Sequence, residues 1–358
     1  MEGSIVIAEF IDTKNSVWMD CLRALPHDFY HLPEYVEICA RYEDAVATAF
    51  YAEAEGERFL APLLLRRLPE ELGAPSEWRD CVSPYGYSAP LVSASQSQLP
   101  KFLDAFCRAG REQGIVTAFF RLHPQLVLDS AILLRYGRLF RHGQTVSMDL
   151  GMTPEEQWQN FSTNHQRNIK KLRKLGFTVS LDEWSRLPEF IEIYHATMRR
   201  VEAGQGYFFV PGYFEDLRAS LGERLHLMSV ISETNEVVAA GLFVVTGEIM
   251  QYHLGGTAPQ YLGLSPSKLM IDFARSWAQE QSCTVLHLGG GVGGAEDSLF
   301  RFKSGFSKRL DPFYSFRLIL DEERNRTLEL AAGYEAAPED GESSFFPRYR
   351  LPVRHAHL

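Results

Sequence analysis

The sequence predicts an α/β (α+β) protein with two domains, and three observations support this prediction. The chain has 358 residues, more than one hydrophobic core of ordinary size accommodates. Its composition, 45% hydrophobic and 23% charged residues, is that of a folded globular protein. Apolar runs of strand length alternate with amphipathic segments of helix length along both halves of the chain.

The first half predicts interleaved strands and helices. Pro33 suits the start of a helix, and two apolar runs around the turn at Glu55, Gly56 and Glu57 predict a hairpin. The expected elements are a short helix over 29–41, the hairpin over 45–69, a helix over 98–113 and a strand over 115–124. We assign residues 1–150 to this first domain.

A capped helix start marks the second domain. Thr153 is a suitable N-cap, Pro154 suits the first helical position, and Glu156 stands three residues after Thr153. We therefore place the boundary near residue 150 and assign 151–330 to the second domain. The acidic and then Pro/Arg-rich segment 331–358 is expected to be a docked or disordered tail.

The second half has a distinctive order of elements: two helices, a three-stranded meander, a helix and a strand. The expected helices cover 154–175, 187–202, 213–222 and 266–282. The expected strands cover 177–183, the meander 225–257, then 284–290 and 313–320. The segment 203–212 is a loop rich in glycine and aromatic residues.

Composition excludes several classes of protein. No apolar run reaches the length of a membrane-spanning helix, and Glu2 and Glu9 flank an N-terminal run that no basic region precedes. We therefore expect a cytoplasmic protein. The cysteines lie far apart and are odd in number, so neither disulfides nor a metal site are expected. They are Cys21, Cys39, Cys81, Cys107 and Cys283.

The net charge of −10 opposes non-specific binding to nucleic acids, so no DNA partner is expected. An anionic ligand would need a local basic patch. One such patch is the run from Arg167 to Lys174, whose cations Arg167, Lys170, Lys171 and Lys174 share one face of a predicted helix. They are candidates for binding substrate phosphates; the alternative is an ordinary solvated helix face.

A turn between a strand and a helix is a candidate cofactor site. It runs from Gln260 through Gly263 to Ser265, and Ser267 and Lys268 open the following helix. It resembles the Q/R-x-x-G-x-G/A turn of the GNAT acetyltransferase superfamily, with Ser265 in place of the last Gly or Ala. There the turn's backbone N–H groups and the helix start hold the pyrophosphate of coenzyme A. The alternative is a plain loop.

A glycine run directly after a predicted strand suggests that backbone or ligand approaches closely. Within it, Gly290 and Gly291 are candidate substrate-binding residues, and Phe302 and Lys303 follow as candidate catalytic residues. The alternative is that the phenylalanines are core and the lysine is a surface charge.

Two residues are candidates for the general base that an attacking amine needs. His253 ends a predicted strand beside Tyr252, a candidate substrate contact, and Asp297 follows the glycine run. A core or capping role for His253 is the alternative. In the first domain, Tyr85 and Tyr87 lie on a predicted loop. These tyrosines either contact the substrate or serve only to hold the loop in place.

Over residues 25 to 320, and most clearly over 160–310, the chain resembles the Fem family, which adds amino acids to peptidoglycan precursors, and its BioF2-like relatives. The matching stretches are NHQRNIKKLRKLG, YLGLSPSKLMIDFARSWA and LHLGGGVGGAEDSLFRFKSGF. Phe302-Lys303 match the family's aromatic-Lys pair. The following pair departs from the family pattern because it reads Gly305-Phe306.

This resemblance implies tandem GNAT-like domains with the acceptor in a cleft between them, Lys303 near the transfer centre, and no tightly bound cofactor or metal. The donor is either an aminoacyl-tRNA or a coenzyme A thioester. The acceptor is a nucleotide- or lipid-linked cell-envelope precursor, and a lipid-linked one would place the protein at the periphery of the inner membrane.

Three functions therefore remain open. The first is Fem-like aminoacyl transfer in cell wall biogenesis. Against it, residues 200–260 contain no long helical arm of the kind with which some tRNA-dependent Fem enzymes bind tRNA. The second is acyl-coenzyme A-dependent N-acetylation of an amino sugar or small amine in polysaccharide biosynthesis. The third is a non-catalytic binding module with the same fold.

Overall fold

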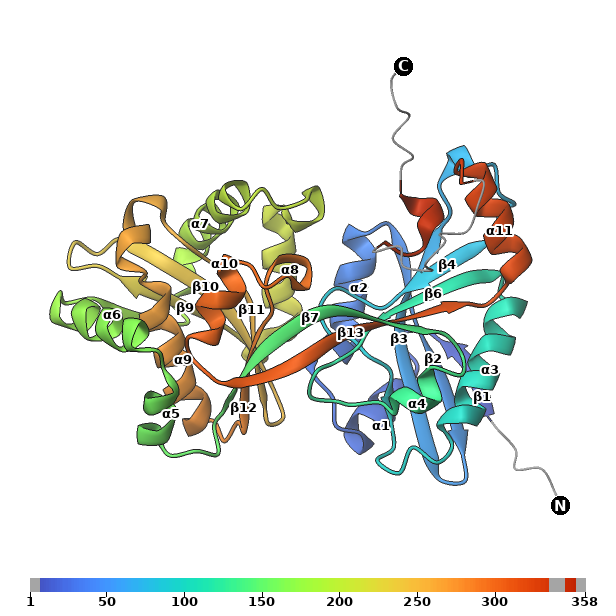
Figure 1. The fold of residues 1–358 in the computed structure, drawn as a ribbon, viewed down its shortest axis with the longest axis horizontal. Helices are drawn as coiled ribbons and strands as arrows, with labels where there is room; N and C mark the ends of the chain where they lie inside the picture. The colour runs from blue at the N-terminus through green and yellow to red at the C-terminus, as the bar shows by residue number, and fades with distance from the viewer. Residues whose placement is uncertain (1–6, 335–344, 352–358) are drawn as a thin grey trace. The chain divides into compact units, whose positions relative to one another are not determined.

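The computed structural model describes residues 7–334 and 345–351 and divides the chain into two compact units. The first unit comprises 1–141 and 314–358, and the second comprises 142–313. The chain passes from one to the other within strands β7 (Arg138–Asp149) and β13 (Arg309–Ile319). Figure 1 shows both strands and the helices around each sheet.

The strands belong to one 13-stranded sheet, and those of the first unit follow the order β1-β2-β3-β4-β6-β13, with β5 paired to β3. A meander of β2, β3 and β4 is followed by α3 and by β6, which lies parallel to β4. Its strands are β1 Ile7–Ile11, β2 Ala45–Ala54, β3 Glu57–Arg67, β4 Arg79–Val82, β5 Leu91–Val92 and β6 Ile115–Arg121. Its helices are α1 Ser16–Ala24, α2 Pro33–Tyr42, α3 Leu99–Glu112, α4 Ser130–Leu133 and α11 Glu322–Ala331.

The second unit repeats this plan with strands in the order β7-β12-β11-β10-β9-β8. An antiparallel meander β9-β10-β11 leads into α9, and β12 returns parallel to β11. Its strands are β8 Thr178–Leu181, β9 Leu225–Ile231, β10 Val237–Thr246, β11 Ile249–Thr257 and β12 Val285–Gly289. Its helices are α5 Pro154–Asn160, α6 Thr163–Lys174, α7 Leu187–Arg200, α8 Pro211–Leu221, α9 Ser267–Glu280 and α10 Ser298–Ser304.

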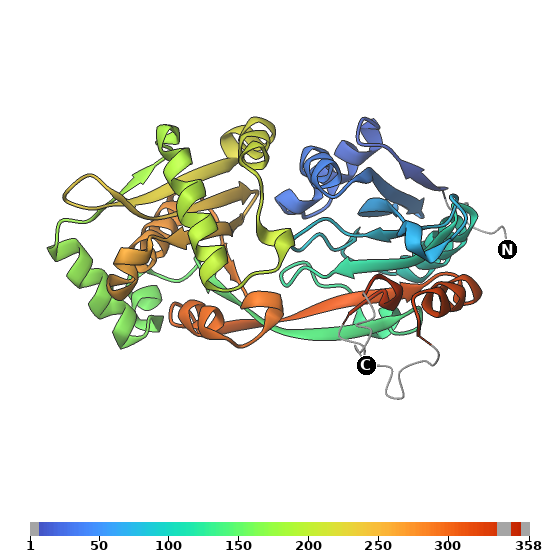
Figure 2. The same ribbon diagram turned by 90° about the horizontal axis from the view of Figure 1, so that it is seen from above.

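Helices α7 and α9 cover opposite faces of β10 and β11. A Cβ atom added to Gly256 would meet Ile193 of α7, whereas one added to Gly241 would meet Met270 of α9. Gly256 pairs with Ala240, the neighbour of Gly241, and successive residues of a strand point to opposite faces. Figure 2 gives the view from above.

The fold prediction, tandem GNAT-like α/β domains, is confirmed, and three of the differences from the expected elements concern the second domain and its boundary. The helix expected over 154–175 is two helices, because Ser162 accepts a hydrogen bond from the backbone N–H of His165 and starts α6 anew. The strand expected to end the second domain is β13, whose residues 315–319 pair with β6 in the first unit. β7, which pairs with β12, was not expected as a strand.

These differences also change the domain description. The compact units divide within β7 rather than after residue 150, and residues 314–330 belong to the first unit rather than to the second. Of the expected tail, residues 335–344 and 352–358 lie outside the described residues. Its described part docks on the first unit: Tyr349 is buried and shares a hydrogen bond of 2.7 Å with Thr117, and Arg350 pairs with Asp80.

Candidate functional site

The parallel strands β11 and β12 of the second unit pair over part of their length and then diverge. Their pairing covers Ile249 to Gln251 against Val285 to His287, after which β11 continues to Thr257 without β12. The β10–β11 register shifts at this point and leaves His253 as the extra residue of a β-bulge. A bulge bends its strand and changes the direction of the side chains, and this one lies beside the point where β11 and β12 stop pairing.

Tyr252 forms an aromatic platform beside the bulge. Its ring stacks on Phe243 at a centroid distance of 5.0 Å and lies over Gly241 and Gly255, which face each other across β10 and β11. A Cβ atom on Gly255 would come within 2.1 Å of the tyrosine hydroxyl oxygen. The paired glycines therefore make the room that the ring occupies, a role the sequence pattern did not reveal.

Lys303 approaches this platform from α10. Its side chain is buried, its Nζ donates a hydrogen bond of 2.8 Å to the carbonyl oxygen of Gly290, and Nζ lies 5.8 Å from the centroid of the Tyr252 ring. Burial lowers the pKa of Lys303 to about 8, and the charge of Asp297 partly opposes this. Lysines whose pKa is lowered in this way by burial are commonly found at functional sites of enzymes.

The glycine loop after β12 is held by Asp297, the N-cap of α10. The Asp297 carboxylate accepts hydrogen bonds from the backbone N–H groups of Val292 at 3.0 Å and Phe300 at 2.8 Å. A Cβ atom on Gly291 would lie 2.0 Å from the Ala295 carbonyl oxygen, so only glycine fits there. Asp297 thus organises the loop; the structure places its oxygens on backbone amides.

The candidate pyrophosphate turn is wound into a 3₁₀-helix, Pro259–Leu264. Its i to i+3 hydrogen bonds engage the backbone N–H groups: Tyr261 donates to Ala258, and Ser265 donates to Leu262. Gly263 has open space around it and meets no close neighbour. Much of the turn is exposed, as binding of coenzyme A would require. Its backbone N–H groups, however, donate to carbonyl oxygens of the turn itself.

The first side chains of α9 are also engaged. Ser267 shares a hydrogen bond with Thr257, and the buried Lys268 donates to the Asn164 side-chain oxygen at 2.5 Å. Burial lowers the pKa of Lys268. Among the candidate cofactor residues that have a side chain beyond Cα, Gln260 is the exposed one.

His253 contacts an aromatic group that the sequence reading missed. Its Nε2 lies 3.3 Å from the hydroxyl oxygen of Tyr213 in α8, and Tyr213 stacks on Phe209 at a centroid distance of 4.1 Å. The only sequence signal was the aromatic density of 203–214. The pair puts a titratable ring at the bulge where β11 and β12 diverge.

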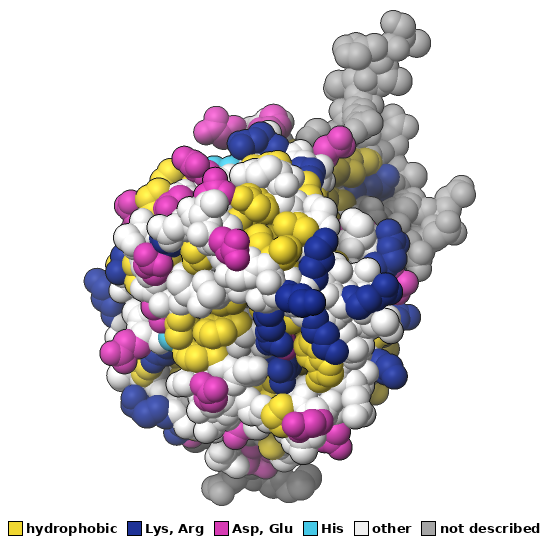
Figure 3. Space-filling model, turned by 90° about the vertical axis from the view of Figure 1, so that its left-hand side faces the viewer, with side chains coloured by type: hydrophobic (Ala, Val, Ile, Leu, Met, Phe, Trp, Pro, Cys, Tyr) yellow, Lys and Arg dark blue, Asp and Glu magenta, His cyan; other side chains and the backbone are white. Residues whose placement is uncertain are grey.

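The basic face of α6 is exposed. Arg167, Lys170, Lys171 and Lys174 form no ion pair with an acidic side chain in the described ranges, whereas Arg173 pairs with the buried Asp272 at 2.6 Å. Lys170 Nζ also lies 5.7 Å from the Trp158 ring centroid. Figure 3 shows Lys and Arg side chains gathered on the end of the second unit where α6 lies.

Comparison with known families decides what this unit is. Residues 159–304, which span α6 to α10, match the sequence model described as "Acetyltransferase (GNAT) domain". The second unit carries a GNAT acetyltransferase domain. The chain is accordingly a GNAT-fold acyltransferase, and the strand divergence, Tyr252 and Lys303 all lie inside this domain.

Solved structures are similar in fold over most of the chain, at low sequence identity. FemX is 14% identical with a TM-score of 0.69, covering 90% of this chain and 100% of its own. L-PGS from Bacillus licheniformis is 14% identical with a TM-score of 0.55, covering 90% and 97%. A structure titled as the C-terminal domain of a lysylphosphatidylglycerol synthetase from Agrobacterium fabrum is 13% identical with a TM-score of 0.51, covering 83% of this chain and 93% of its own. No curated protein sequence matches the chain.

In the first unit, the strands that correspond to β11 and β12 of the GNAT domain stay together. Beyond the end of β4, Ser83 donates its backbone N–H to Phe119 at 2.8 Å, and the backbone N–H of Arg121 donates to the Ser83 hydroxyl at 2.9 Å. The sheet therefore opens in the GNAT domain and is closed at the equivalent place here.

The two candidate tyrosines of the first unit are part of an aromatic cluster. The Tyr85 carbonyl accepts a hydrogen bond from Tyr35, and the Tyr87 ring lies 5.9 Å from the ring of Tyr30. Gly86 between them has φ +101°, and a Cβ there would lie 2.1 Å from Tyr30. These contacts pin the loop, and both tyrosines keep part of their surface exposed.

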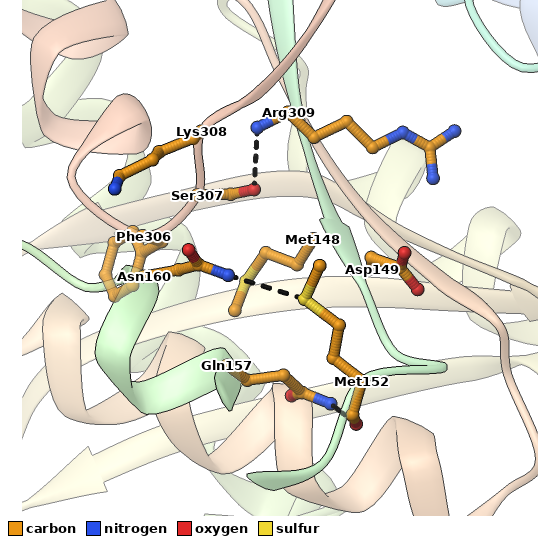
Figure 4. Close-up of a pocket in the computed structure, with 9 residues that line it drawn as sticks. All are labelled: Met148, Asp149, Met152, Gln157, Asn160, Phe306, Ser307, Lys308 and Arg309. Carbon is orange, nitrogen blue, oxygen red and sulfur yellow. Dashed lines mark hydrogen bonds between the residues drawn. The ribbon is translucent and has the colours of Figure 1, made fainter. Parts of the chain in front are cut away.

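The GNAT domain also has a small pocket of about 160 Å³, which Figure 4 shows between α5 and the loop after α10. Gln157 and Asn160 line it and donate to the Met152 carbonyl oxygen and sulfur, respectively. Small-molecule sites usually have about 300–1,000 Å³. The pocket is below this range and contains none of the candidate site residues.

The described residues contain no group of three or more His, Cys, Asp and Glu side chains placed to hold a metal ion. The five cysteines carry free thiols, and all but Cys107 are buried. No helix within the described ranges is long and apolar enough to cross a membrane.

Proposed function

We propose that the protein transfers an aminoacyl group to the amine of a cell-envelope precursor of the peptidoglycan type, as in the Fem family. The observation that carries this proposal is the buried Lys303 ammonium, held on the Gly290 carbonyl and over Tyr252 where β11 and β12 diverge. A preformed cation in a site from which water is largely excluded is suited to stabilising charge that develops on an acyl oxygen.

In the proposed reaction, the acceptor amine attacks the carbonyl carbon of an aminoacyl ester. The new C–N bond forms, the carbonyl oxygen carries the negative charge of the tetrahedral intermediate, and Lys303 stabilises that oxygen. Collapse of the intermediate breaks the C–O ester bond. His253, which contacts Tyr213, is the proposed acceptor of the amine proton, and the leaving oxygen finally takes up a proton.

The cations of α6 are the proposed binding site for phosphates of the acceptor. Because the chain has a net charge of −10, an acceptor that carries diphosphate is repelled unless such a patch binds it. None of these four cations has an acidic partner among the described residues, so their charges are available to a ligand. They are Arg167, Lys170, Lys171 and Lys174. We expect either a nucleotide-linked or a lipid-linked precursor.

The pyrophosphate turn supports the choice of an aminoacyl ester over coenzyme A as donor. Its amides engage carbonyls of its own 3₁₀-helix, and Lys268 is engaged by Asn164, so few groups remain to hold a pyrophosphate. N-acetylation with acetyl coenzyme A is the second candidate, and the match to an acetyltransferase domain favours it.

A binding and turnover experiment separates these functions. The purified protein is titrated with acetyl coenzyme A and with aminoacyl-tRNA, each with a UDP-linked amino-sugar or muropeptide acceptor, and amide formation is followed by mass spectrometry. Amide formed from aminoacyl-tRNA alone supports the proposal. Product from acetyl coenzyme A, together with a melting-temperature increase that Gly263→Glu abolishes, supports the second candidate. Binding without turnover identifies a non-catalytic module.

A further inference from the structure

A buried histidine joins the basic helix to the helix that carries Lys303. The His165 ring, in the first turn of α6, donates from Nε2 to the carbonyl oxygen of Phe302 at 2.8 Å. It meets the Phe306 ring edge-on at a centroid distance of 4.4 Å. A Cβ atom on Gly305 would lie 2.4 Å from this ring, so glycine is what allows the ring to pack there.

The hydrogen bonds define the state of this ring. The Phe302 carbonyl can only accept, so His165 carries its proton on Nε2, and Nδ1 accepts from the Ser162 hydroxyl at 3.0 Å. Burial, together with the positive charge of Lys268, lowers the pKa of His165 to about 4. The hydrogen bond to the Phe302 carbonyl acts in the opposite direction and raises this pKa. At neutral pH the ring is therefore a fixed neutral donor.

A second hydrogen bond ties the same two segments together. The backbone N–H of Ser162 donates to the Gly305 carbonyl at 2.8 Å. Lys303 stands between the two tied residues, Phe302 and Gly305, and its side chain extends to the Gly290 carbonyl oxygen. The end of α10 is thus anchored to the start of α6 on both sides of Lys303.

We propose that His165 is a positioning residue for Lys303: by holding the carbonyl of Phe302, it fixes the helix end from which the ammonium reaches Gly290 and Tyr252. This inference rests on the proposed role of Lys303 in acyl transfer. It assigns no contact between His165 and either substrate.

The position of Lys303 can be measured without knowing the substrates. In protein labelled with ¹⁵N/¹³C-lysine, the Lys303 signal is identified by its loss in Lys303→Arg, and its pH titration is followed by NMR. Wild type should titrate near pH 8, where burial depresses the pKa and Asp297 is the opposing charge. His165→Phe keeps a ring but loses the donor, so the amine should become more hydrated and titrate at higher pH.

Two further variants make this test specific. His165→Gln can still donate to the Phe302 carbonyl and should restore a titration near that of wild type. His226→Phe removes a histidine of the same domain that is bonded to Asp182, and it should leave the Lys303 titration unchanged. If His165→Phe does not fold, Gly305→Ala displaces the ring from the other side and should shift the titration in the same direction.

The kinetic expectation follows from the geometry. His165→Phe should lower kcat about a hundredfold, as a small misplacement of a functional group can, with little change in KM. The inference is overturned if His165→Phe, or Gly305→Ala in its place, leaves both the Lys303 titration and kcat at their wild-type values. If Lys303→Met itself retains full turnover, the proposed function of Lys303 fails instead, whatever the titration of the His165 variants.

Discussion

The ammonium nitrogen of Lys303 lies 2.8 Å from the carbonyl oxygen of Gly290, the first residue after strand β12. This contact links α10 to the end of the strand that diverges from β11. It also leaves the charged group beside the Tyr252 ring rather than in solvent. The predictions about catalysis follow from this one placement.

Replacing Lys303 by methionine should lower kcat by about a hundredfold or more, the loss typical of removing one group that stabilises an oxyanion. The measurement is the rate of amide formation at saturating donor and acceptor. Lys308→Met removes an exposed lysine of the same domain and should leave the rate unchanged. Equal rates in wild type and Lys303→Met would exclude the catalytic role.

The pH dependence of kcat/KM should have an alkaline limb near pH 8. The pKa of Lys303 is lowered to about 8, chiefly by burial, and the proposed active form is the cation. Activity is therefore present below that pH and is lost as the pH rises through it. Lys303→Arg keeps a charge at these pH values and should move the limb to higher pH. A limb that stays in place in this variant belongs to another group.

The order of elements in the GNAT domain was predictable because each element carries a strong local signal. The meander 225–257 has turns at Asn235 and Gly247, and β10 at its centre is almost wholly apolar because helices cover both faces. The Thr153 cap was equally local. The backbone N–H of Glu156 donates to the Thr153 hydroxyl, and the Glu156 carboxylate accepts from the Thr153 backbone N–H, as a capping box requires.

What the sequence could not predict depends on contacts between distant residues. β13 has the pattern of any strand, and nothing local says that it pairs with β6, about two hundred positions away. His165 stands in a run of basic residues, yet its proposed role rests on contacts with Phe302 in α10 and with Gly305, the residue after that helix. Lys268 was a plausible phosphate ligand by position, and its bond to Asn164 is equally non-local.

The glycine loop should tolerate no side chain at residue 291. In Gly291→Ala the new methyl group would clash with the Ala295 carbonyl and the Asp297 carboxylate, so the loop that supplies the Gly290 carbonyl must shift. We expect kcat to fall about a hundredfold. Gly204→Ala, at a glycine with open space around it, is the matched control and should behave as wild type. Full activity of Gly291→Ala would show that the loop geometry does not matter for transfer.

Reversing charge on the basic face of α6 should weaken acceptor binding without affecting the fold. In Arg167→Glu with Lys171→Glu, two exposed cations become anions, and KM for a diphosphate-linked acceptor should rise. Its dependence on salt concentration should also become weaker. Lys14→Glu with Arg108→Glu makes the same charge change on exposed residues of the first unit and serves as control. If both double variants have the same KM and salt dependence, the face is not a phosphate site.

The carboxylate of Asp272 in α9 joins this helix to α6 through Arg173. Asp272 is fully buried and accepts hydrogen bonds from Arg275 at 3.0 and 3.2 Å and from Arg173 at 2.6 Å. Asp272→Ala would leave the buried Arg275 guanidinium without its anionic partner, with a hydrogen bond to the Gln157 side-chain oxygen and the Phe161 ring beside it. Removing one partner of a buried pair costs about 3–5 kcal/mol, so urea should unfold the GNAT domain at markedly lower concentration. Asp20→Ala breaks the exposed Arg23 pair and should cost less than about 1 kcal/mol. Equal urea midpoints for the two variants would mean that the buried pair contributes no more than a surface one.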